Sequence, residues 1–132
     1  MTTTKLAKLK HVHFEHRLWD SELETVQQEV DYFLKYLDFL KIETIGNSKQ
    51  ALAVAEFYNH FRHYQRLVAR LLKDLSLIKK EVAEGVLHDN VLDKEQTLDH
   101  KYLSEDMKYF ESDYFETKKS FKEFIKTVDL YD

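Results

Sequence analysis

Cysteine and proline are absent from the 132 residues of this chain, and glycine occurs only twice, as Gly46 and Gly85. Without cysteine there can be no disulfide, no thiolate nucleophile, no zinc-finger framework and no iron–sulfur ligation. Without proline, and with two glycines, the chain has too few turn residues for a fold built on sheets. These absences favour long helices, which a charged share of 33% and a hydrophobic share of 43% also fit.

Long apolar runs are lacking as well. No segment approaches the roughly 20 apolar residues that a membrane-spanning helix needs, and residues 1–10 are polar and contain lysines, unlike a signal peptide. We therefore expect a cytoplasmic protein without a membrane partner. An excess of positive charge is also missing, because the formal net charge is −4, and we expect no nucleic-acid partner.

The two glycines divide the chain into three segments of nearly equal length. Gly46 suits the position just after a helix, and Asn47 with Gln50 can form the capping box of the next one. Gly85 is the second expected helix end. The following helix would then begin at one of three N-cap candidates: Asp89, Asn90 or Asp93.

We expect helices at about residues 5–42, 48–84 and 90–130. Because the connections are short, these segments predict an all-α, up-down-up antiparallel bundle of three long helices, and residues 1–132 should form one domain. Each segment carries an apolar stripe at 3–4 spacing, as in a coiled coil, which we call the seam. Its positions are Leu9, Val12, His16, Trp19, Leu23, Val26, Val30, Phe33, Leu37 and Leu40; Val54, Phe57, Phe61, Tyr64, Val68, Leu71, Leu75, Ile78 and Val82; and His100, Leu103, Met107, Phe110, Tyr114, Thr117, Phe121, Phe124, Val128 and Tyr131.

Two histidines occupy seam positions, His16 in the first segment and His100 in the third. Residues equidistant from a tight antiparallel turn lie at one level, and by this rule both histidines are level with Leu75. Imidazoles and carboxylates from several helices are the ligands with which bundles bind iron, manganese or zinc. The candidate metal ligands are His16, His100, Asp74, Asp99 and His13.

Two interpretations of this polar layer stay open. As a metal site it would hold a divalent ion and could serve an oxidoreductase or an oxygen-handling protein. As a structural layer it would only hydrogen-bond the flanking aspartates and fix the helix register, with no cofactor. A second, looser group combines His60 with Asp31, Glu29 and Tyr114. The Glu-x-x-His pattern of di-iron bundles is absent, as are phosphate loops and nucleophilic triads, so a non-enzymatic protein is expected.

The first helix is apolar nearly all round towards its C-terminal end. A helix that is hydrophobic on every side is usually covered on every side, and one three-helix seam covers only part of it. We therefore expect Tyr32, Tyr36 and Phe39 to form an interaction surface for a homodimer or another protein partner. The leading hypothesis is a self-associating interaction or structural protein, and a metal-binding bundle is the alternative.

Overall fold

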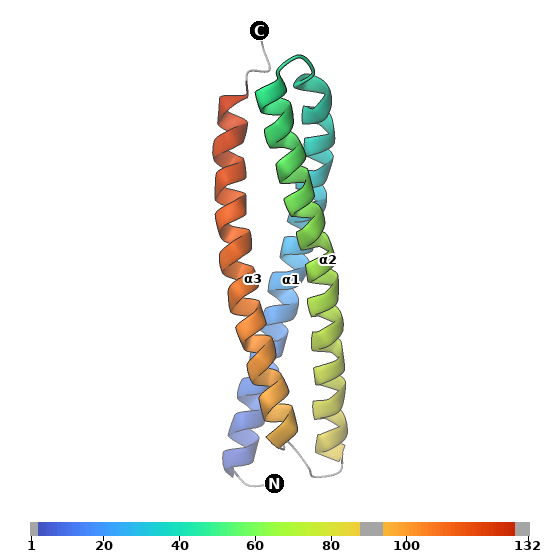
Figure 1. The fold of residues 1–132 in the computed structure, drawn as a ribbon. Helices are drawn as coiled ribbons and strands as arrows, with labels where there is room; N and C mark the ends of the chain where they lie inside the picture. The colour runs from blue at the N-terminus through green and yellow to red at the C-terminus, as the bar shows by residue number, and fades with distance from the viewer. Residues whose placement is uncertain (1–2, 88–93, 129–132) are drawn as a thin grey trace. The chain divides into compact units, whose positions relative to one another are not determined.

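The computed structural model describes residues 3–87 and 94–128, which form three α-helices (Figure 1). They are α1 (Thr3–Glu43), α2 (Ser48–Leu87) and α3 (Lys94–Thr127). The all-α prediction is confirmed, and the bounds of α1 and α2 lie within three residues of the expected ones. The expected start of the third helix at residue 90 and its last expected residues, 129–130, lie outside the described residues. So do the three N-cap candidates, Asp89, Asn90 and Asp93.

The turn between α1 and α2 forms as its sequence predicts. Gly46 has φ +95, a left-handed conformation that suits glycine just after a helix. The backbone N–H of Gln50 donates to Oδ1 of Asn47 at 3.0 Å, so Asn47 caps the start of α2. The second predicted helix end is wrong. The helix α2 continues through Gly85, which is buried, as far as Leu87, because one glycine costs a helix only about 1 kcal/mol.

The predicted seam supplies the core. Among the described residues, every seam position is buried or half-buried. The buried ones are Val12, His16, Trp19, Leu23, Val30, Leu37 and Leu40 of α1; Val54, Phe61, Tyr64, Val68, Leu71 and Leu75 of α2; and Leu103, Met107, Phe110, Tyr114 and Phe121 of α3. The 3–4 spacing therefore identified the inward face of each helix. Removal of these side chains from water is the main contribution to stability.

The contacts of the helices define two compact units, and all three helices contribute a segment to each. The first unit comprises residues 1–25 and 69–109, and the second comprises residues 26–68 and 110–132. In the first unit Lys79 of α2 pairs with Asp20 of α1. In the part of the chain that the structure describes, no helix has the length and apolar character needed to cross a bilayer.

In the second unit α1 and α2 run antiparallel. As residue numbers rise along α1, the residues of α2 that they contact have falling numbers. Gln65 donates to Asp31, and further along α1 the Lys41 ammonium lies 3.5 Å from the centre of the Tyr58 ring. The helices α2 and α3 behave in the same way. Their ring contacts are Tyr64 with Phe110 and Phe57 with Phe124. These directions are consistent with the predicted up-down-up bundle.

Candidate functional site: a buried imidazole pair beside a cavity

The side chains of His16 and His100 meet in the first unit, as their common level predicts. Nε2 of His16 lies 3.0 Å from Nδ1 of His100, and the ring centroids are 5.1 Å apart. A neutral imidazole carries a single N–H, so one of the two facing nitrogens donates and the other accepts. The imidazole pair therefore joins α1 to α3 by a polar contact at seam positions.

The ring of Trp19 packs against both imidazoles. It stacks on His100 with a centroid distance of 5.0 Å and an interplanar angle of 26°, and it lies 5.6 Å from the ring of His16. Trp19 is itself buried, one turn along α1 from His16. This large ring shields the imidazole pair from water, and His16 retains only 2% of its surface exposed.

The pKa of His16 is lowered from 6.5 to about 4, chiefly by burial. The neighbouring His100, Lys79 and His13 act in the same direction, and the carboxylate of Asp20 opposes them. The imidazole of His16 is therefore neutral at physiological pH, because a charged ring would lose its hydration without gaining a compensating carboxylate contact. A neutral imidazole is the form that accepts a hydrogen bond or binds a metal ion.

The two predicted aspartates do not make the expected contacts. Asp74 and Asp99 are half-buried, and neither forms a hydrogen bond or an ion pair with another residue that the structure describes. The nearby carboxylate is that of Glu15, whose Oε1 lies 3.7 Å from Nε2 of His100 and 2.5 Å from Nε2 of His11. Sequence reasoning missed Glu15, although its i, i+4 spacing from His11 was a usable signal.

The structure thus brings two of the five predicted metal ligands into contact, His16 and His100. A third, His13, is exposed and lines a cavity together with His16. Across residues 3–87 and 94–128, no group of three or more histidine, aspartate or glutamate side chains is arranged to hold a metal ion.

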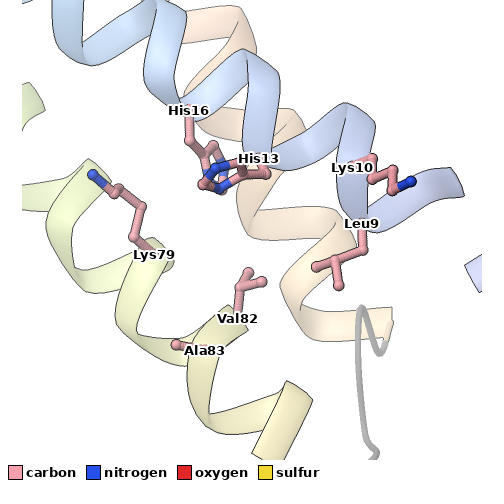
Figure 2. Close-up of a pocket in the computed structure, with 7 residues that line it drawn as sticks. All are labelled: Leu9, Lys10, His13, His16, Lys79, Val82 and Ala83. Atoms are coloured by element: carbon pink, nitrogen blue, oxygen red, sulfur yellow. The ribbon is translucent and has the colours of Figure 1, made fainter. Parts of the chain in front are cut away.

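The cavity beside His16 lies between α1 and α2 in the first unit and has a volume of about 670 Å³ (Figure 2). Figure 2 shows the imidazoles of His13 and His16 together on the side of α1 that faces α2. A second cavity, of about 510 Å³, touches His100 and Glu15 between α1 and α3. The two imidazoles of the pair therefore line different cavities. The first cavity is lined by Leu9, Lys10, His13, His16, Lys79, Val82 and Ala83.

The looser group predicted around His60 assembles only in part, and in the second unit. The hydroxyl of Tyr114 donates to Oε1 of Glu29 at 2.9 Å, and Lys118 donates to Oε2 of the same carboxylate at 2.5 Å. Burial, together with the Glu29 carboxylate, raises the pKa of Tyr114. His60 is exposed, and Asp31 bonds to Gln65 instead. This group holds α1 against α3 and leaves the histidine in solvent.

The three predicted interaction residues lie on one partly exposed side of α1 in the second unit. Tyr32 is 66% exposed and Phe39 is 43% exposed, while Tyr36 is half-buried between them. Their i, i+4 and i+7 spacing places them on one side of the helix, and the rings of Tyr36 and Phe39 lie 5.8 Å apart. We call these three residues the aromatic face. Two of the three side chains are exposed, and the role of the aromatic face stays a prediction.

Comparison with protein-family models, with curated proteins and with solved structures finds no match to this chain. Function is therefore inferred from the imidazole pair, its cavity and the aromatic face.

Proposed function

We propose that the chain is a non-enzymatic helical-bundle protein that self-associates through the aromatic face of α1. The observation that supports this is the exposure of Tyr32 and Phe39, which leave 66% and 43% of their surfaces in water on one helix face. Single exposed apolar side chains are ordinary, but a contiguous group on one face marks an interaction surface.

A second copy of the chain suits this face because the spacing of its rings repeats the spacing of the seam. Helices that carry apolar residues at 3–4 spacing pack against helices with the same pattern. A two-fold symmetric dimer uses one face twice, and an antiparallel pairing centred between Lys35 and Tyr36 would place Tyr32 of one copy against Phe39 of the other. Such aromatic pairs contribute roughly 0.5–1.5 kcal/mol beyond the area they bury.

The apolar surface near this face is large enough to contribute to a stable dimer. A fully covered aromatic side chain buries roughly 150–250 Å². Ile42, three residues beyond Phe39 on α1, is a further 67% exposed. Together with the aromatic face it can supply part of the roughly 800 Å² that each partner contributes to a standard interface.

Sedimentation equilibrium tests this proposal. We expect the wild-type chain to be a dimer at micromolar concentration and the Tyr32→Ser/Phe39→Ser variant to be a monomer that keeps its helical circular dichroism. The matched control is Phe14→Ser/Tyr109→Ser, which removes aromatic rings that are 64% and 79% exposed in the first unit. The control should remain dimeric. A monomeric wild-type chain would overturn the proposal.

A second candidate function, binding of a divalent metal ion, is favoured by the geometry of the imidazole pair. Two nitrogens that each lie about 2.1 Å from one ion are about 3.0 Å apart at the 90° angle of an octahedral site and about 3.4 Å apart at the tetrahedral angle that zinc prefers. The separation between His16 Nε2 and His100 Nδ1 is 3.0 Å, and His16 is in the neutral form that ligation needs. The same distance also fits a simple hydrogen bond, so an experiment must separate the two functions.

Elemental analysis of untagged protein, purified without a chelator, makes this separation. Metal binding predicts stoichiometric iron, manganese or zinc that is lost in both His16→Ala and His100→Ala. A structural layer predicts metal-free protein whose histidine variants lose only stability. Metal that persists in both variants would contradict a site at this pair.

A further inference from the structure

Two seam positions, Leu9 and Val82, are only half-buried in the first unit. Both line the cavity between α1 and α2, whereas Leu71 and Leu75, further from the end of α2, are completely buried. The helices here leave a space of about 670 Å³ where neighbouring side chains would otherwise pack. This volume lies within the range of roughly 300–1,000 Å³ that is usual for small-molecule sites.

The wall of the cavity is mainly apolar. Leu9 lies on the α1 side, and Val82 and Ala83 lie on the α2 side, with the side chain of Val82 directed towards the two imidazoles in Figure 2. The rings of His13 and His16 form one end of the space. An apolar wall with polar groups gathered at one end fits a ligand that has an apolar body and one polar head.

Among the residues that the structure describes, the two charged ones that line the cavity are both cationic. Lys10 and Lys79 lie at opposite sides of it in Figure 2, and the cavity has no carboxylate among its described lining residues. Asp20 accepts from Lys79 at 2.5 Å, while Lys10 forms no ion pair with a described residue. Lysine stems can lie along apolar surface and keep the ammonium in water. Asp20 offsets the charge of Lys79, so Lys10 is the lysine of the lining that would attract an anionic head group and repel a cationic one.

The geometry points to this cavity as a binding site for a free single-chain amphiphile with an anionic head group, of the fatty-acid type. The alkyl chain would lie against Leu9, Val82 and Ala83. The head group would stay at the rim, near Lys10 and the exposed imidazole of His13. This site lies in the first unit and does not depend on the proposed self-association.

The chain carries its own reporter for such a ligand. It contains one tryptophan, Trp19, whose ring lies 5.6 Å from that of His16, a residue of the cavity wall. We would titrate the full chain with decanoate, decanol and decyltrimethylammonium, and follow tryptophan fluorescence and isothermal titration calorimetry together. Saturable binding of decanoate, at least about tenfold tighter than either analogue, is the expected result; tenfold corresponds to about 1.4 kcal/mol. No binding by either method, or equal binding of all three compounds, would overturn the inference.

Paired variants test the location of the site. Ala83→Phe fills the cavity and should abolish decanoate binding, while Ala69→Phe, at an exposed position of α2 in the same unit, should leave it unchanged. Lys10→Glu should weaken decanoate binding and leave decanol binding unaffected, and Lys73→Glu, an exposed lysine of α2 that does not line the cavity, is its control. Wild-type affinity in both Ala83→Phe and Lys10→Glu would contradict the assignment.

Vesicles distinguish a free amphiphile from a membrane surface. The chain should not sediment with vesicles of anionic phospholipid, because the cavity accepts a single chain rather than a bilayer. Sedimentation with such vesicles, without binding of monomeric decanoate, would overturn the inference in favour of a membrane-surface role.

Discussion

Nε2 of His16 lies 3.0 Å from Nδ1 of His100, which joins side chains that stand 84 positions apart in the sequence. Both imidazoles occupy positions that the apolar pattern assigns to the core. Each ring supplies the polar partner that the other needs in a largely apolar environment, so the two residues should act as one energetic unit.

Removal of one imidazole should lower the free energy of unfolding by more than the hydrogen bond itself contributes, because the other imidazole is left buried without a partner. We expect His100→Ala to lower the free energy of unfolding by roughly 1–3 kcal/mol, because the buried His16 loses its hydrogen-bond partner. The double variant His16→Leu/His100→Leu should cost less than the sum of the two single leucine variants. Urea unfolding of all four chains measures this coupling, and strictly additive costs would contradict it.

Acid should weaken the fold through His16. The pKa of this residue is about 4 in the folded chain, against an ordinary value of 6.5 that applies to the unfolded chain. As pH falls, the unfolded state therefore takes up a proton first. The stabilisation of the fold by the neutral His16 is complete above pH 6.5 and is lost as pH falls from 6.5 to about 4. The expected loss is roughly 3 kcal/mol, at about 1.4 kcal/mol for each pKa unit. Unfolding titrations should show a smaller fall in His16→Leu, and identical pH profiles would refute this assignment.

The hydroxyl of Tyr64 should stabilise the second unit. It bonds to Oγ1 of Thr117 at 2.7 Å and to Oδ2 of Asp113 at 3.0 Å. We expect Tyr64→Phe to lower the free energy of unfolding by about 1–2 kcal/mol, because the ring is kept and these bonds are lost. Tyr109→Phe, at a residue that is 79% exposed, is the control and should have no measurable effect. Equal stability of the Tyr64 variant and the wild type would contradict the role of the hydroxyl.

Alkaline pH gives an independent test of the same residue. Burial, with Asp113 acting in the same direction, raises the pKa of Tyr64 from 10.0 to about 12. As pH rises, the unfolded state releases the Tyr64 proton first. The stabilisation linked to the raised pKa is therefore complete below pH 10 and is lost as pH rises towards 12. Urea unfolding between pH 9 and pH 12 should therefore show a steeper loss of stability in the wild type than in Tyr64→Phe.

The sequence predicts the fold well because helical periodicity depends on local spacing. Leu37, Val68 and Met107 lie in three different segments, and each is buried as the 3–4 pattern requires. The same periodicity, together with the positions of the two turns, predicted that His16 and His100 lie at one level of the bundle. Gly85 was misjudged because a glycine stops a helix only where the chain has a better alternative to continued helical hydrogen bonding.

The details of the candidate site depend on side-chain directions, which periodicity does not define. Equal distance from a turn places Asp74 and Asp99 near the level of the imidazole pair, but it does not predict the direction of their carboxylates. Glu15 contacts His11 and lies near His100 through its own rotamer. The cavity beside His16 was not predictable either, because its volume depends on how far two helices separate at one level.

The left-handed backbone conformation of Gly46, in the turn after α1, offers a local test of the fold. Gly46 has φ +95, and a Cβ added there would meet no atom within 4 Å. Gly46→Ala should therefore lower the unfolding free energy by roughly 1 kcal/mol through backbone conformation alone, without a steric clash. Thermal unfolding measures this, and an unchanged or raised melting temperature would argue against the left-handed turn.

Self-association through the aromatic face of α1 predicts a defined distance between two copies of the chain. The chain has no cysteine, so Lys35→Cys, beside Tyr36 on the exposed side of α1, gives a single spin-label site. Pulsed electron resonance should show an intermolecular distance on the order of 20–30 Å, because packed helices lie about 10 Å apart. The distance should disappear when Tyr32→Ser and Phe39→Ser are added. Absence of an intermolecular distance in the labelled chain, or its persistence in the serine variant, would contradict self-association through the aromatic face.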